Sequence, residues 1–178
     1  NIFFGHGLRP LLEETSAQVK GATVFGYHVT DPERYGVVEF DEQNVVKSIV
    51  EKPLVPASKY AVTGLYFLDE TASARAKCVK PSVRGELEIV SLLESYLEDE
   101  RLYLKTMGRG YAWLDTGTHA SLLDAGNFVR TLQNRQGLQT GCLEEISFEK
   151  GWISENELML LAEPLQKNGY GAYLMGLI

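Results

Sequence analysis

Runs of hydrophobic residues predict a set of β-strands in the first two thirds of the chain. Residues 21–29, GATVFGYHV, are rich in β-branched and aromatic side chains and predict a strand. Residues 37–40 and 45–51 predict a hairpin, because the polar segment 41–44 separates them. Residues 60–69, YAVTGLYFLD, form a nearly continuous apolar run, which is typical of a strand buried on both faces inside a mixed sheet.

Hydrophobic residues spaced three and four apart predict helices around these strands. We expect helices at residues 8–18, 70–80, 85–97 and 118–137. The third helix places Ile89, Leu93, Tyr96 and Leu97 on one face. Residues 101–115 return to strand, with a break at residues 108–110. After residue 141 the pattern predicts short helices, with Ser154 as a helix cap.

The order of these elements predicts an α/β protein. The sheet portion is expected to run to about residue 135, and a helical segment to fill residues 136–178. The chain begins with Asn1 in the middle of an apparent strand-to-loop junction, so we expect that it continues a longer protein.

Composition excludes several classes of function. The net charge is −7 and the sequence pI is about 5.0, which argues against binding to nucleic acid or to an anionic membrane. No apolar run approaches the roughly 18 residues of a membrane-spanning helix. The two cysteines, Cys78 and Cys142, fit neither a disulfide framework nor a metal site, so we expect reduced, packed thiols and a cytoplasmic protein.

Two segments carry cations that suit a phosphate. Glu51 and Lys52 precede Pro53 at the end of a predicted strand, where both side chains can turn toward a ligand. Arg84 stands just before the expected helix start at residue 85, and free helix N–H groups beside an arginine favour a phosphate. Each feature taken alone is more often an ordinary surface group, a solvated pair or a capping turn.

Two further segments carry weaker signals. Tyr35 and Gly36 offer a ring and a close backbone approach to a ligand, or form a simple turn. Asp115, in GYAWLDTGT, follows an apolar run and precedes a helix, so it is either a metal ligand or an N-cap-like acid. A single carboxylate needs a second oxygen ligand to hold a divalent metal.

The order of the motifs is more specific than any one of them. The run NIFFG, RYGVVEF, EKP, AVTGLYF, RGELEI and WLDTGT resembles the glucose-1-phosphate thymidylyltransferases, a family of sugar nucleotidyltransferases. The resemblance extends to the tail motifs CLEEI and GYGAYL. It implies part of a Rossmann-like, mixed-sheet nucleotidyltransferase fold whose N-terminal, nucleotide-binding half is absent from this chain.

The resemblance also implies roles for particular residues. The sugar-phosphate part is expected at residues 1–135. The glucosyl pocket is implied to contain Tyr35, Gly36, Glu51, Val62 and Tyr66, with Trp113 as its floor. Lys52 and Arg84 are implied to hold the sugar phosphate, and Asp115 to be one of two aspartates that bind Mg²⁺. The other aspartate belongs to the part of the family pattern that lies before Asn1.

The same resemblance implies a homotetramer with a regulatory nucleotide-sugar site at a subunit interface. Residues near that site correspond to Phe4, Gly5, Arg109 and Ile146. Residues 136–178 are then a regulatory and oligomer-interface segment.

The expected reaction is thymidylyl transfer from dTTP to glucose 1-phosphate, giving dTDP-glucose and pyrophosphate. Two alternatives stay open. One is a uridylyltransferase of the same fold, because the residues that read the base are missing from this chain. The other is a catalytically inert module that binds sugar phosphate or assembles into oligomers. The chain by itself is expected to be inactive.

Overall fold

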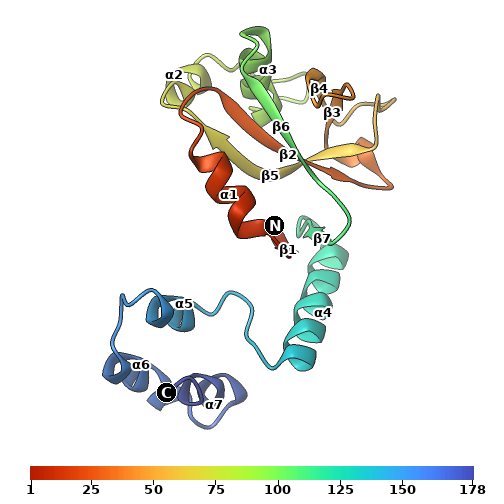
Figure 1. The fold of residues 1–178 in the computed structure, drawn as a ribbon. Helices are drawn as coiled ribbons and strands as arrows, with labels where there is room; N and C mark the ends of the chain where they lie inside the picture. Colours follow the sequence, from red (N-terminus) through yellow and green to blue (C-terminus); the bar gives the residue numbers. More distant parts are fainter. The chain divides into compact units, whose positions relative to one another are not determined.

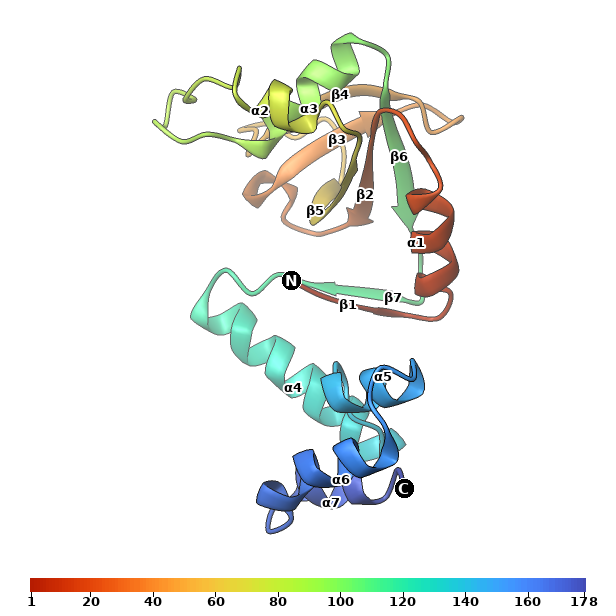
Figure 2. The ribbon, with the colours of Figure 1, turned by 90° about the vertical axis from the view of Figure 1, so that its left-hand side faces the viewer.

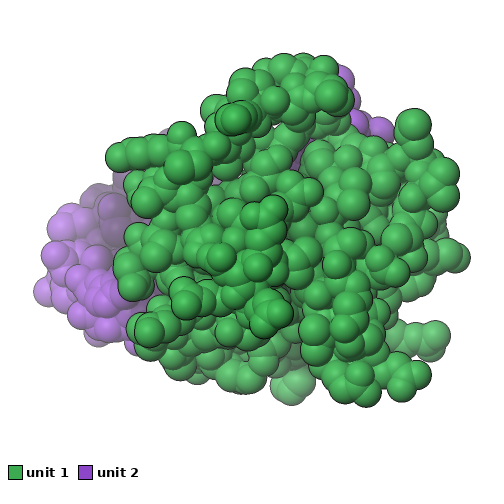
Figure 3. All heavy atoms as spheres, turned by 90° about the horizontal axis from the view of Figure 1, so that it is seen from above, with its two compact units in different colours: residues 1–114 green, residues 115–178 purple.

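The chain divides into two compact units in the computed structural model, which describes residues 1–178. The first unit is Asn1–Leu114 and the second is Asp115–Ile178, coloured separately in Figure 3. The boundary expected at residue 135 separates two functional parts and stays a prediction. The division into compact units falls earlier, so that the long helix after Asp115 belongs to the second unit.

A five-stranded mixed sheet organises the first unit (Figure 1). In spatial order its strands are β4 (Val46–Glu51), β3 (Gly36–Phe40), β5 (Tyr60–Leu68), β2 (Ala22–His28) and β6 (Leu102–Met107). Strands β2 and β6 are parallel, and the other pairs are antiparallel. The predicted hairpin is therefore confirmed as β3–β4, and β5 has the predicted interior place in the sheet. Burial on both faces is confirmed only for Ala61, Val62 and Thr63, since the rest of β5 is half-buried or exposed.

A separate two-stranded ribbon is formed by β1 (Ile2–Gly5) and β7 (Tyr111–Leu114), which lie side by side in Figure 2. The strands are antiparallel and pair Gly5 with Tyr111. A Cβ atom at Gly5 would lie 2.5 Å from the Tyr111 ring, so glycine allows this close pairing. The predicted break at residues 108–110 is confirmed, because it separates β6 from β7.

Three α-helices belong to the first unit: α1 (Leu8–Ser16), α2 (Ala72–Ala76) and α3 (Ile89–Glu98). The helix predicted at residues 70–80 is thus shorter than expected, and the one predicted at residues 85–97 begins four residues later. The buried side chains of α3 are Val90, Leu92, Leu93 and Tyr96, whereas Ile89 is exposed, contrary to prediction.

The core of the first unit lies between α3 and the sheet. The α3 side chains pack with buried sheet residues Ala22, Val24, Val38, Val46, Ile49, Val62, Leu102 and Leu104. Burial of a large aliphatic side chain contributes about 1.5–3 kcal/mol. Packing against the strands therefore sets the position of α3, which in turn sets the position of the end of the loop before Ile89.

The second unit is helical. It contains α4 (His119–Gln136), α5 (Leu143–Glu149), α6 (Glu155–Ala162) and α7 (Gly169–Met175), and a single 3₁₀ turn at Glu163–Leu165. The first unit has one such turn, at Pro32–Arg34. Ser154 caps α6 in a capping box, and Gly137 ends α4 with φ of 72°, as predicted. Ala125 is the one buried residue of α4.

A small core joins the last helices around Leu158, Ala162 and Leu174. The Tyr170 hydroxyl donates to Glu144 at 2.5 Å, which ties α7 to α5. Cys142 packs in this core, but Cys78 is exposed, so the prediction of two packed thiols is wrong for Cys78. No helix in the chain has the length and apolar character needed to cross a membrane.

Asp69 fixes the junction between β5 and α2. Its carboxylate accepts hydrogen bonds from the Gly21 amide at 2.8 Å, the Thr71 hydroxyl at 2.5 Å and the Tyr96 hydroxyl at 2.8 Å. The Thr71 hydroxyl contributes most to holding the pKa of Asp69 well below its usual range. The charged carboxylate thus connects β2, β5 and α3.

We expect Asp69→Asn to lower the free energy of unfolding by about 1–3 kcal/mol at neutral pH, because buried donors lose their charged acceptor. A lowered folded-state pKa gives stability above the unfolded-state pKa of about 4, and this stability declines as the pH falls below that value. Urea unfolding of both proteins between about pH 2 and 7, a range that spans the titration of a carboxylate, measures the loss of stability and its pH dependence.

The matched control is Glu70→Gln, which alters an exposed neighbouring carboxylate. It should leave the unfolding curves unchanged. Equal pH dependence in the unsubstituted protein and in Asp69→Asn would contradict the role of Asp69.

Candidate functional site

The end of the β3–β4 hairpin brings an acid and a base together. Gly36 of β3 pairs with Glu51, the last residue of β4. Lys52 then adopts φ of 43°, a left-handed conformation that is uncommon outside glycine. Because the strand has ended, the Lys52 ammonium lies on the same side as Glu51, with Nζ 3.9 Å from Oε1. The two side chains therefore lie together at the strand end, and that they turn toward a ligand stays a prediction.

The backbone of Lys52 is fixed as well. Its amide donates a hydrogen bond to the carbonyl of Tyr35 at 2.9 Å. The strained conformation is therefore held by the neighbouring turn, and strain of this kind costs about 1–3 kcal/mol. Residues held in such conformations concentrate at ligand sites, which makes Lys52 a candidate binding residue.

Arg84 lies in a loop and not at a helix start. The helix α3 begins at Ile89 with Glu88 as its N-cap residue, so the expectation of free helix N–H groups beside Arg84 is wrong. The Arg84 guanidinium instead faces carboxylates. Its Nη2 lies 2.7 Å from Glu88, 3.1 Å from Glu86 and 3.7 Å from Glu51.

Glu88 holds Arg84 by one edge. Its Oε1 accepts hydrogen bonds from Arg84 Nη2 at 2.7 Å and from Nε at 3.3 Å, and from the Ser82 hydroxyl at 3.0 Å. The Arg84 hydrogen bond is the main cause that lowers the pKa of Glu88. No hydrogen bond reaches Arg84 Nη1, which leaves that nitrogen available for an anion.

These groups line one cavity of about 220 Å³. Its walls are Glu51, Lys52, Ser82, Val83, Arg84, Glu88, Val90, Ser91 and Glu94. Burial, and then the charge of Glu88, raise the pKa of Glu51, while Lys52 and Arg84 oppose that rise. The cavity wall therefore carries two cations, Lys52 and Arg84, together with the carboxylates of Glu51, Glu88 and Glu94.

Gly36 has no side chain, so Val90, Glu51 and Val62 can lie close to its backbone. A Cβ atom there would lie 2.9 Å from Val90 Cγ2, 3.2 Å from Glu51 Oε2 and 3.9 Å from Val62. Burial, and then the charge of Glu51, raise the pKa of Tyr66 on β5. Four residues implied by the resemblance thus lie around one hairpin end: Tyr35, Gly36, Glu51 and Val62.

Trp113 stands beside this group on β7. Its ring meets the Tyr35 ring edge to face, with centroids 5.1 Å apart. Its indole Nε1 donates to Asn1 Oδ1 at 2.8 Å. The Asn1 side chain in turn lies against Gly64, where a Cβ atom would approach its Nδ2 to 2.3 Å. Trp113 is therefore placed next to β5 and the Tyr35 turn.

Asp115 begins the second unit and supplies one carboxylate. Its Oδ1 accepts a hydrogen bond from the Gly117 amide at 3.1 Å. The N-cap of α4 is Thr118, which bonds the Ser121 amide in a capping box, so the alternative role of Asp115 as an N-cap-like acid is wrong. No group of three histidine, cysteine or acidic side chains in the chain can hold a metal. The oxygen suits a hard divalent cation, but it is one ligand of an incomplete set.

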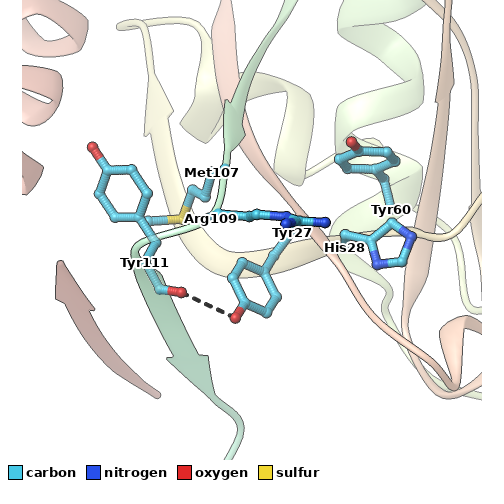
Figure 4. A pocket seen from close by; sticks show the side chains of 7 residues that line it. Tyr27, His28, Tyr60, Met107, Arg109 and Tyr111 are labelled. Carbon is cyan, nitrogen blue, oxygen red and sulfur yellow. Dashed lines mark hydrogen bonds between the residues drawn. The ribbon is translucent and has the colours of Figure 1, made fainter.

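The residues expected near a regulatory site fall on three segments of the chain. Phe4 and Gly5 lie on β1 opposite Ala112 and Tyr111. Arg109 precedes β7 and lines a second cavity of about 430 Å³ in the first unit (Figure 4). That cavity is also lined by Tyr27, His28, Tyr60, Met107, Gly108 and Tyr111. Ile146 lies on α5 of the second unit and is 39% exposed.

Sequence reasoning missed three residues of these sites. Glu88 could have been found, because it follows Arg84 at the helical spacing of four residues. Asn1 and Tyr27 gave no local signal, since each reaches Trp113 only through pairing between distant segments.

We expect Glu88→Gln to lower the pKa of Glu51, because it removes a nearby negative charge and leaves Arg84 less neutralised. An NMR pH titration of the ¹³C-labelled Glu51 carboxyl measures the shift. The control Glu39→Gln removes an exposed carboxylate that pairs with Ser48, and it should leave the pKa of Glu51 unchanged. The same pKa in both variants would show that Glu88 does not act on Glu51.

Comparison with known proteins identifies similar proteins over nearly the whole chain. A relative from Xanthomonas campestris pv. campestris (strain B100), named glucose-1-phosphate thymidylyltransferase, is 59% identical over 177 residues, which are 99% of this chain and 60% of that protein. A protein of the same name from Neisseria meningitidis serogroup A is 53% identical over 178 residues, 100% of this chain and 62% of that protein. The chain therefore spans about three fifths of the length of these curated relatives.

A solved structure and a family profile extend the comparison. A crystal structure of a protein assigned as a glucose-1-phosphate thymidylyltransferase from Bacillus anthracis, in complex with sucrose, is 41% identical. It matches with a TM-score of 0.63 over 72% of this chain and 51% of that one. The profile of the family described as nucleotidyl transferase matches residues 1–131. Because this match covers well over half of the chain, the chain belongs to the nucleotidyl transferase family.

Proposed function

We propose that the protein containing this chain is an enzyme, a glucose-1-phosphate thymidylyltransferase. The observation that carries the proposal is the meeting of Glu51, Lys52 and Arg84 around one cavity, in a chain of the nucleotidyl transferase family. Two close cations suit a phosphate monoester, and a half-buried carboxylate suits hydroxyl donors. The names of the relatives support a glucosyl phosphate as the substrate.

The residues have distinct proposed roles. Lys52 and Arg84 bind the phosphate of glucose 1-phosphate and neutralise its charge. Glu51 accepts hydrogen bonds from sugar hydroxyls. Gly36, Val62 and Tyr66 shape the wall beside Glu51, while Tyr35 and Trp113 offer aromatic faces against which a pyranose ring can pack.

The proposed reaction is a displacement at phosphorus. An oxygen of the sugar 1-phosphate attacks the α-phosphorus of dTTP, and a new P–O bond forms. The bond from that phosphorus to the bridging oxygen breaks, and pyrophosphate leaves with its electron pair. No covalent enzyme intermediate is needed, so the chain contributes by alignment and by charge neutralisation at Lys52 and Arg84.

A divalent metal is part of the proposal, and we infer that it is Mg²⁺. Asp115 would hold it through a carboxylate oxygen, the ligand type that Mg²⁺ prefers. When bound, such an ion neutralises charge on the reacting phosphates. The second carboxylate ligand is expected from the part of the relatives' length that this chain does not span.

The remaining functional assignments are proposals of the same kind. Residues 1–135 are the sugar-phosphate part, and residues 136–178 are a regulatory and oligomer-interface segment. Phe4, Gly5, Arg109 and Ile146 contribute to a regulatory site in a homotetramer. A cytoplasmic location is consistent with two free cysteines.

Pyrophosphate release by the full-length protein tests the reaction. With glucose 1-phosphate and a divalent cation, we expect turnover with dTTP to exceed turnover with UTP. Asp115→Ala should reduce turnover by orders of magnitude, because the metal loses a ligand. Faster turnover with UTP would identify a uridylyltransferase, and no turnover with either nucleotide would leave the inert binding module as the better description.

We expect Lys52→Ala to raise the KM for glucose 1-phosphate about tenfold or more, because a charge-assisted contact to phosphate contributes about 1.5–3 kcal/mol. Initial rates at saturating dTTP measure this effect. Lys59→Ala is the matched control, since Lys59 is an exposed lysine outside the cavity. An unchanged KM in Lys52→Ala would remove this lysine from the phosphate site.

A further inference from the structure

Tyr27 links the large sheet to the β1–β7 ribbon. Its hydroxyl donates a hydrogen bond to the backbone carbonyl of Tyr111 at 3.1 Å, and Figure 4 shows the side chain extending toward that carbonyl. Its ring meets the Trp113 ring edge to face, with centroids 5.9 Å apart and an interplanar angle of 73°. One side chain on β2 therefore contacts two positions of β7.

The ribbon depends on such side-chain contacts. Strands β1 and β7 pair with each other and form no backbone ladder with the five-stranded sheet. The position of Trp113 relative to the hairpin end therefore depends on its side-chain neighbours as well as on the short connection from β6 to β7. Among these neighbours are Tyr35, Asn1 and Tyr27.

Tyr27 has a feature that simple packing does not require. Its side chain is half-buried and lines the cavity of about 430 Å³, where a phenylalanine would fill the same space. The hydroxyl is what reaches the Tyr111 carbonyl, so it fixes the distance between β2 and the start of β7. The Tyr27 ring then orients the indole of Trp113, which lies two residues after Tyr111 on β7, because edge-to-face geometry is directional.

We propose that Tyr27 is a positioning residue that holds Trp113 in place for the sugar pocket. This inference rests on the proposed function, in which Trp113 forms the floor of that pocket. Tyr27 acts through Trp113 and does not touch the reacting phosphates. Loss of its hydroxyl loosens the ribbon and weakens sugar-phosphate binding, while the charged groups of the phosphate site stay unchanged.

The first experiment observes Trp113 directly. The protein is labelled with 5-fluorotryptophan, and the ¹⁹F resonances of Trp113 and Trp152 are assigned with Trp152→Phe. We expect Tyr27→Phe to shift or broaden the Trp113 resonance. Trp152, in the second unit and 72% exposed, is the internal reference and should not change. A Trp113 resonance identical to that of the unsubstituted protein would overturn the proposal.

The matched control is Tyr60→Phe. Tyr60 lines the same cavity, but its ring meets Phe40 and His28, at centroid distances of 4.9 and 5.6 Å, and not Trp113. This variant removes a tyrosine hydroxyl from the same wall. It should leave the Trp113 resonance and the sugar-phosphate KM as they are, and an equal effect of both variants would overturn a specific role of Tyr27.

The second experiment separates binding from turnover in the full-length protein. We expect Tyr27→Phe to raise the KM for glucose 1-phosphate about two- to tenfold, the range that one hydrogen bond produces, with kcat changed less than about twofold. An unchanged KM despite a shifted Trp113 resonance would overturn the link to the sugar pocket. Absence of turnover in the unsubstituted protein would instead refute the proposed function, and the ¹⁹F result would still decide whether Tyr27 positions Trp113.

Discussion

The packing of α3 against the open end of the β3–β4 hairpin is the constraint on which the candidate site depends. Val90 approaches Gly36 so closely that a Cβ atom would meet its methyl group at 2.9 Å. Burial of Val90, Leu93 and Tyr96 drives this approach. The same packing fixes Glu88 at the helix start, and Glu88 then holds Arg84 over the hairpin end where Lys52 emerges.

In this cavity, carboxylates orient the Arg84 guanidinium and leave part of it exposed to a ligand. Arg84 faces Glu51, Glu86 and Glu88, yet Glu88 engages one edge of the guanidinium and leaves Nη1 without a hydrogen bond. A planar guanidinium clamped in this way loses little freedom when it binds a phosphate. Lys52 contributes a second charge from a backbone conformation that turns it toward the same space. The protein thus presents two oriented cations within an acidic chain.

Aromatic contacts govern the other side of the site. Trp113 lies on a two-stranded ribbon, where few backbone constraints act on it, and its position follows from Tyr27, Tyr35 and Asn1. These residues come from three separate segments of the first unit. Such an arrangement makes the pocket floor sensitive to contacts outside the pocket, which is the basis of the positioning role proposed for Tyr27.

The sequence by itself determined the strands, the hairpin, most helices, and the presence of Glu51–Lys52 at a strand end. These follow from local periodicity, from proline and glycine, and from the short-range geometry of a strand that stops. Only the tertiary structure decided that Arg84 precedes α3 by a loop and pairs with Glu88. It also decided that Tyr27 and Asn1 meet at Trp113. The physical reason is that ion pairing in a loop and contacts between distant strands arise from the packing of whole elements, which no local pattern of residues encodes.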